Sequence, residues 1–220
     1  MAEISISAFA SDILHIEKGM HMLDNLPVSS LHIDIMDGHF VPMYGFNPLW
    51  IRRIQEIQPL KQDFHFMAYV TEKMLIDYLR LGPDMITLHV ETKKSWDNRY
   101  LLKFIKNHGV KAGVAVAPGT AVDSLREYFP IVDDILIMSA EPGQEHALFI
   151  ENTFSRIKKI RELIKEEGVS VTLSVDGGLD EKSAVRAIKS GADRVVIGRA
   201  FFCAGDRRKM LEEILQAYSI

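Results

Sequence analysis

The sequence predicts an α/β fold, a single (β/α)8 barrel that occupies residues 1–220. Short apolar runs, of the length of buried strands, alternate with amphipathic stretches from end to end, which indicates parallel strands joined by helices. Eight such units share the chain at about 27 residues each, close to the minimum for one strand and one helix. An open, doubly wound sheet is the alternative arrangement of the same units.

The eight expected strands are short runs rich in Val, Ile, Leu and Met, as strands buried on both faces are. In chain order they cover residues 4–7, 31–35, 64–67, 85–89, 112–116, 135–138, 171–175 and 195–197. No Gly/Pro-rich linker and no block of like charges divides the chain, so we expect one catalytic domain over residues 1–220.

The clearest expected helix covers residues 150–167. Apolar residues recur there three or four apart, charged residues take the other side, and Gly168 is placed to end the helix. Asp180 stands where it would cap the next helix, which Gly191 closes before the last strand. Asp206 can cap a final helix that runs to the C-terminus.

Composition and charge exclude several classes of protein. With 47% hydrophobic and 25% charged residues, the chain is neither disordered nor of low complexity. The net charge of −4 gives no general attraction to nucleic acid or to an anionic membrane, and Cys203 is the only cysteine, so no intramolecular disulfide forms. The longest run without charged residues, 38–51, contains two prolines, and no signal peptide is recognisable. We expect a cytoplasmic protein without membrane or nucleic-acid partners.

Titratable side chains are concentrated at the ends of the expected strands, where the active sites of parallel barrels lie. His32 and Asp34 are two residues apart, so a strand turns both to one face. His65 lies in the next strand, and Asp176 ends the seventh. Each alone would fit a hydrogen-bonded polar residue at the barrel mouth. Two imidazoles and two carboxylates together predict one divalent metal ion, with Zn, Fe, Mn and Co as the candidates.

Glycines at two neighbouring strand ends predict a second site. Gly177 and Gly178 follow the seventh strand, and Gly198 and Arg199 follow the eighth. Loops after these two strands commonly bind phosphate in such barrels through backbone N–H groups. Arg199 can add a positive charge to such a site, although an arginine on the surface is the alternative.

One segment carries a specific family resemblance. The run His32-Ile-Asp34-Ile-Met-Asp37-Gly-His-Phe-Val-Pro42 resembles the signature of the ribulose-phosphate 3-epimerase family. The resemblance covers nearly the whole chain. The other matching segments are Ser7, His65-Phe-Met67, residues 88–92, 113–120 and 138–143, Asp176-Gly-Gly178 and residues 191–198.

The resemblance implies a TIM barrel of the ribulose-phosphate-binding type, with one divalent metal ion held by His32, Asp34, His65 and Asp176. It also implies that Asp34 and Asp176 are the catalytic acid and base. Epimerisation beside a ketone needs a base on one face and an acid on the other, and a metal ion would stabilise the enediolate between them. The implied enzyme is an isomerase that converts D-ribulose 5-phosphate to D-xylulose 5-phosphate in the pentose phosphate pathway of carbohydrate metabolism.

The resemblance also implies contacts to a sugar-phosphate substrate. The expected substrate-binding residues are Ser7, His65, Met36, Met67 and Met138. The expected phosphate-binding residues are Gly143, Gly177, Gly178, Gly198 and Arg199. Plain apolar packing explains the methionines equally well. His89, at the end of the fourth strand, either orients a ligand or packs in the pocket wall.

Three departures from the family pattern concern the substrate. Met43 stands where the family commonly has Asn, residues 144–147 replace a Gly-rich run that helps hold phosphate, and Arg199 replaces the usual Ser. The metal and acid/base residues are unchanged by these departures. A ketohexose 6-phosphate such as D-allulose 6-phosphate is therefore the alternative substrate.

Two other functions fit a phosphate-binding barrel. A lyase is disfavoured because the strand ends carry no Lys, and a non-catalytic sugar-phosphate sensor is disfavoured because it would need neither Asp34 nor Asp176. The outer helices of a barrel can associate in several ways, so the sequence leaves open whether the protein forms a homo-oligomer.

Overall fold

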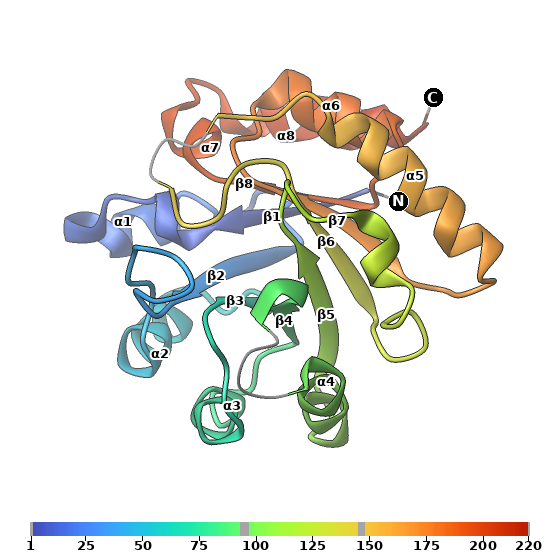
Figure 1. The fold of residues 1–220 in the computed structure, drawn as a ribbon. Coiled ribbons are helices and arrows are strands. Elements are labelled where there is room, and N and C mark those ends of the chain that lie inside the picture. Colours follow the sequence, from blue (N-terminus) through green and yellow to red (C-terminus); the bar gives the residue numbers. More distant parts are fainter. Residues whose placement is uncertain (1, 93–96, 145–147, 220) are drawn as a thin grey trace.

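The strands close into a barrel. The computed structural model describes residues 2–92, 97–144 and 148–219. Within them eight parallel strands are hydrogen-bonded in chain order, and the last pairs with the first (Figure 1). The strands are β1 (Glu3–Ser7), β2 (Ser30–Met36), β3 (Gln62–Met67), β4 (Met85–His89), β5 (Lys111–Val116), β6 (Asp134–Met138), β7 (Thr172–Asp176) and β8 (Arg194–Ile197). The predicted barrel is confirmed, and the open doubly wound sheet is excluded.

Helices surround the barrel in Figure 1. They are α1 (Ile16–His21), α2 (Pro48–Ile57), α3 (Glu72–Leu79), α4 (Asn98–Asn107), α5 (Thr153–Glu166), α6 (Glu181–Lys189), α7 (Arg199–Cys203) and α8 (Arg207–Gln216). Short 3₁₀ helices are η1 (Ala8–Ala10), η2 (Ile13–His15), η3 (Val90–Thr92), η4 (Val122–Leu125) and η5 (Ala217–Ser219). Among the described residues, no helix is both long and apolar enough to span a lipid bilayer.

The helix ends follow the predicted caps in two places and depart from the prediction in others. The Asp180 side chain accepts from the backbone N–H of Ser183, and Asp206 caps α8 in the same way. The helix expected from residue 150 begins at Thr153 instead, and the backbone N–H of Ile150 donates to the carbonyl oxygen of Ser139, the residue after β6. In the fifth unit, η4 lies between β5 and β6, where an α-helix was expected. The last helix, α8, was expected to run to the C-terminus, but it ends at Gln216 and is followed by η5.

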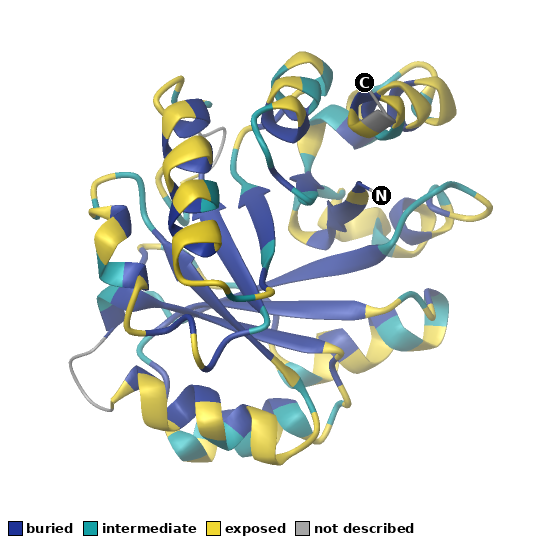
Figure 2. Ribbon diagram, turned by 90° about the vertical axis from the view of Figure 1, so that its right-hand side faces the viewer, coloured by how far each residue is buried: buried dark blue, intermediate teal, exposed yellow. Residues whose placement is uncertain are grey.

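Alternate residues of each strand face opposite sides of the barrel wall. On β2, Leu31, Ile33 and Ile35 are at most 1% exposed and belong to one large apolar cluster that includes the inner faces of the helices. Figure 2 shows this layering, with buried strands inside and helices exposed on their outer faces. Burial of each such side chain is worth roughly 1.5–3 kcal/mol, so this outer layer holds the barrel closed.

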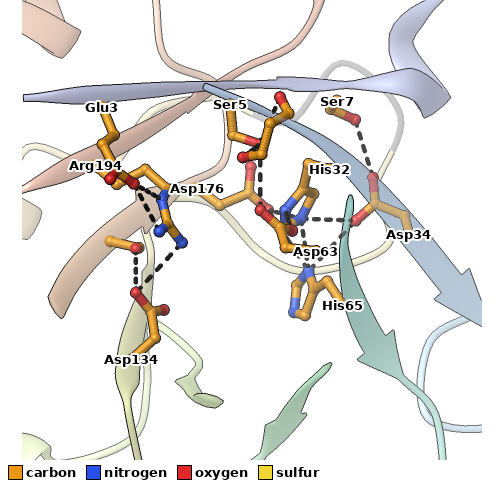
Figure 3. Close-up of polar contacts among 12 residues, drawn as sticks. Glu3, Ser5, Ser7, His32, Asp34, Asp63, His65, Asp134, Asp176 and Arg194 are labelled. Atoms are coloured by element: carbon orange, nitrogen blue, oxygen red, sulfur yellow. Dashed lines mark hydrogen bonds and ion pairs between the residues drawn. The ribbon is translucent and has the colours of Figure 1, made fainter. Parts of the chain in front are cut away.

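The barrel interior is polar near the amino ends of the strands. Arg194 on β8 pairs with Glu3 at 2.7 Å and with Asp134 of β6 at 3.5 Å (Figure 3). Ser174 also donates to Asp134 at 2.7 Å. Burial raises the pKa of Asp134 to about 6, although Arg194 and Ser174 oppose the rise. The polar interior of the barrel therefore contains a carboxyl group, that of Asp134, whose ionisation lowers the stability of the folded state.

Asp134→Asn should differ from the parent protein in the pH dependence of its stability. The carboxyl pKa rises from 3.8 to about 6, so between these values the folded state binds more protons than the unfolded state. As the pH increases through this window, the parent loses stability relative to the variant by at most about 1.4 kcal/mol per pH unit. Urea unfolding of both proteins at several pH values measures the difference. A difference independent of pH would contradict the prediction.

Candidate metal centre

Four titratable side chains meet at the carboxyl end of the barrel. His32 and Asp34 come from β2, His65 from β3, and Asp176 from the end of β7 (Figure 3). Asp34 and His65 are register partners, which brings them together from neighbouring strands. One ligating atom from each of the four residues lies within 4.8 Å of the others. The structure thus brings together the four residues for which the sequence predicts a metal site.

The spacing of these atoms fits a small divalent cation. His32 Nε2 lies 3.2 Å from His65 Nδ1, 3.4 Å from Asp34 Oδ1 and 3.5 Å from Asp176 Oδ2. His65 Nδ1 lies 3.3 Å from Asp34 Oδ1 and 3.7 Å from Asp176 Oδ2. Bonds of about 2.1 Å to a tetrahedral ion would separate its ligands by about 3.4 Å. Asp34 Oδ1 is buried without a hydrogen-bond partner, as a metal-ligating oxygen would be.

Asp34 is held in its ionised form. Burial raises the pKa of this carboxyl, but His32 and His65 outweigh burial and keep the pKa well below its usual range. The Ser7 hydroxyl donates to Asp34 Oδ2 at 3.0 Å, which leaves Oδ1 to face the cluster. Ser7, predicted as a substrate contact, therefore lies beside the proposed acid/base group.

Each histidine of the cluster has a second partner on its other ring nitrogen. His32 Nδ1 contacts the Asp63 carboxylate, whose other oxygen accepts from Ser5 at 3.2 Å. His65 Nε2 lies 2.9 Å from His89 Nε2. Outer partners of this kind fix the tautomer and the orientation of metal-ligating histidines.

His89 is in turn bound to an acidic residue. Its Nδ1 lies 3.0 Å from Glu91 Oε2. Burial lowers the pKa of His89, which keeps the ring neutral. Burial raises the pKa of Glu91, but the hydrogen bond from His89 and other contacts lower it to about 2, so Glu91 is ionised.

Asp63 and Glu91 are absent from the predicted site. A signal for Asp63 is present in the sequence, because it stands two residues before His65 and a strand turns both to one face. Glu91 stands two residues after His89 but lies in η3, beyond the end of β4, so strand alternation does not place it.

The three predicted methionines do not form one group. Met36 and Met67 are register partners and pack with Val41 of the loop after β2. Met138 is the register partner of Asp176, but its side chain packs with Leu136 and other residues of a separate cluster. Met36 and Met67 therefore belong to one wall of the mouth, and Met138 lies in a different cluster beside β7.

Comparison with known proteins decides the family. A sequence model of the ribulose-phosphate 3 epimerase family matches residues 3–202. The chain belongs to this family. The resemblance predicted from the strand-end motifs is thus confirmed, and the chain is an isomerase of the epimerase class.

Curated members of the epimerase family align over most of the chain. Ribulose-phosphate 3-epimerase of Treponema pallidum (strain Nichols) is 32% identical over 205 residues, which cover 93% of each protein. The Bacillus subtilis (strain 168) enzyme is 31% identical over 209 residues, which cover 94% of this chain and 92% of the relative. The chloroplastic enzyme of Arabidopsis thaliana is 33% identical over 184 residues, 84% of this chain and 66% of the longer plant protein.

Solved structures outside the epimerase family have the same barrel. A 3-hexulose-6-phosphate synthase is 15% identical with a TM-score of 0.64, covering 98% of this chain and 99% of its own. Orotidine 5'-phosphate decarboxylase from Pyrococcus horikoshii OT3 is 17% identical with a TM-score of 0.68, covering 99% of both chains. At these identities the likeness concerns the fold alone.

The predicted phosphate residues lie in three loops at the same end of the barrel. Gly177 and Gly178 directly follow β7 and have positive φ angles of 115° and 64°. Gly198 precedes α7, and exposed Arg199 is the first residue of that helix. None of these residues is part of the four-residue cluster.

The loop after β6 contains the main departure from the family pattern. Gly143, with φ 67°, lies so close to Val41 that an added Cβ would stand 2.4 Å from the Val41 Cβ. Gln144 is exposed, and residues 145–147 lie outside the described part of the chain.

Proposed function

We propose that the chain, as one catalytic domain over residues 1–220, is a metal-dependent 3-epimerase of a ketose phosphate, converting D-ribulose 5-phosphate to D-xylulose 5-phosphate. The observation that carries the proposal is the pair of carboxylates, Asp34 and Asp176, which face one metal-sized gap from β2 and β7. Two buried histidines complete a donor set suited to Zn²⁺, Fe²⁺, Mn²⁺ or Co²⁺.

The two carboxylates divide the proton transfers between them. One removes the proton from C3 of the substrate, and the other returns a proton to the opposite face of the same carbon. The Ser7 hydroxyl donates to Asp34 Oδ2, which leaves Oδ1 to face the gap between the four residues. A divalent ion bound to His32, Asp34, His65 and Asp176 would supply positive charge to the substrate oxygens as negative charge develops.

The remaining predicted residues would bind the substrate around this centre. His65 and Ser7 offer polar contacts, while Met36, Met67 and Met138 offer apolar, polarisable surface. Backbone groups of Gly143, Gly177, Gly178 and Gly198, together with the Arg199 guanidinium, would bind the phosphate group.

A ketohexose 6-phosphate such as D-allulose 6-phosphate is the second candidate substrate. Met43, where the family commonly has Asn, packs against the cluster of Met36, Val41 and Met67 and so changes the wall of the mouth. Measurement of kcat/KM for a panel of pentulose and hexulose phosphates tests which sugar is preferred.

Incubation of the enzyme with each sugar phosphate in heavy water tests the reaction. An epimerase incorporates one solvent deuterium at C3 and breaks no carbon–carbon bond. A shortened sugar would indicate a lyase, and an unchanged sugar would indicate a sensor. Either outcome would overturn the proposal.

Arg199→Ser should weaken the use of the phosphorylated sugar. A charge-assisted hydrogen bond to phosphate is worth roughly 1.5–3 kcal/mol, so kcat/KM should fall roughly 10- to 100-fold, mainly through KM. Steady-state kinetics with the phosphorylated and the unphosphorylated ketose measures the effect, and any activity on the latter should barely change. A KM within about twofold of the parent value would mean that Arg199 forms only a surface ion pair.

A further inference from the structure

The hydrogen bonds behind His65 form a chain that leads away from the cluster. His65 directs Nδ1 toward the cluster and Nε2 toward His89 Nε2, at 2.9 Å. His89 Nδ1 lies 3.0 Å from Glu91 Oε2, and Glu91 Oε1 accepts from the backbone N–H of Ala117 at 2.9 Å. Both histidines are 0% exposed, so bulk water does not compete for these contacts.

The carboxylate at the end of this chain determines where each proton lies. An ionised carboxylate only accepts hydrogen bonds, so Glu91 requires the His89 proton to be on Nδ1. The lone pair of His89 is then on Nε2, where it accepts the Nε2–H of His65. With its own proton on Nε2, His65 turns the Nδ1 lone pair toward the position that a metal ion would take among the four residues. Glu91 thereby selects, from the far side of His89, the tautomer that can ligate a metal ion.

We propose that Glu91, acting through His89, is a positioning residue that holds His65 in its metal-ligating tautomer. The inference rests on the proposed function in one respect, because it requires the metal site of which His65 is a part. His32 has a shorter version of the same arrangement, since the Asp63 carboxylate contacts its Nδ1 directly. Loss of such outer partners typically lowers metal affinity or activity 10- to 100-fold.

Glu91→Gln tests the inference because an amide can reverse the direction of the chain. The amide oxygen accepts from Ala117 as before, and the NH₂ group then donates to His89 Nδ1. The His89 proton moves to Nε2, so His65 must carry its proton on Nδ1, where it competes with the metal. The affinity for Co²⁺, measured without substrate by competition with a chelating dye, should fall about 10- to 100-fold. Glu212→Gln, the same charge change on the exposed face of α8, should leave the affinity unchanged.

A second variant distinguishes positioning from a general loss of structure. His89→Gln places a side-chain carbonyl where it can accept from His65 Nε2 without help from Glu91. Adding Glu91→Gln to this variant should then change the Co²⁺ affinity by less than about threefold, because the two positions act through one chain. Circular dichroism of the metal-free proteins verifies that each variant is folded, and the visible absorption of bound Co²⁺ reports whether the coordination changes.

Two results would overturn the inference while the proposed function stands. The first is a Glu91→Gln affinity within about twofold of the parent value. The second is an equal loss of affinity in the parent and in the His89→Gln background, which would assign Glu91 a structural role at Ala117. If the parent protein binds no Co²⁺ at all, the proposed metal site fails and the inference fails with it.

Discussion

Asp34→Asn and Asp176→Asn should each lower the rate of epimerisation roughly 10²- to 10⁴-fold, the usual contribution of a positioned acid or base. The amide preserves the size of the side chain but can neither take up nor release the proton at C3. Steady-state turnover measures the loss. Asp77→Asn, in an exposed ion pair on α3, is the matched control and should retain normal activity. Near-normal turnover in either site variant would exclude the two-carboxylate mechanism.

The same two variants should differ in isotope exchange. Each retains one carboxylate, which can still remove the C3 proton from one of the two epimers and return a deuteron to the same face. Asp34→Asn and Asp176→Asn should therefore wash deuterium into opposite epimers without interconverting them. Because the two carboxylates are also proposed ligands, the metal content of each variant must be measured in parallel. Exchange into the same epimer by both variants would contradict the division of roles.

Removal of the divalent ion should abolish activity. Two carboxylates and two imidazoles are proposed to bind one ion per chain, and that ion would stabilise the negative charge that develops on the substrate. The four-residue cluster contains neither Lys nor Arg to take over this role. Dialysis against a chelator, followed by elemental analysis and stepwise return of Zn²⁺, Fe²⁺, Mn²⁺ or Co²⁺, measures stoichiometry and recovery together. Circular dichroism before and after dialysis controls for unfolding. A fully active preparation free of metal would refute the assignment.

The sequence predicted every strand, but it placed the start of several strands too late. The pattern of apolar runs placed the beginning of β3 at residue 64 and of β6 at residue 135, whereas these strands begin at Gln62 and Asp134. It thereby excluded Asp63 and Asp134, which belong to the strands and point into the polar interior of the barrel. Hydrophobic periodicity reports the strand face that packs against helices, because only that face is uniformly apolar here.

The convergence of His32, Asp34, His65 and Asp176 was predictable for a related reason. The carboxyl ends of all strands of a parallel barrel lie at the same end of the barrel, and the two-residue spacing of His32 and Asp34 puts both side chains on one side of β2. The grouping of the methionines was not predictable in this way. Whether Met138 packs beside Met36 or with Leu136 depends on side-chain contacts across the barrel, which a strand pattern does not contain.

The close approach of Gly143 to Val41 has a consequence for evolution and engineering of the mouth. These residues come from the loops after β6 and β2, and any side chain at 143 would overlap the Val41 isopropyl group. The two positions are therefore epistatic, and a bulkier residue at 143 is accessible only after residue 41 has become smaller. Even then, φ of 67° at 143 favours Gly or Asn over other residues. Libraries that exchange one of these loops alone would return mostly inactive chains, so altered sugar specificity should be sought by varying both loops together.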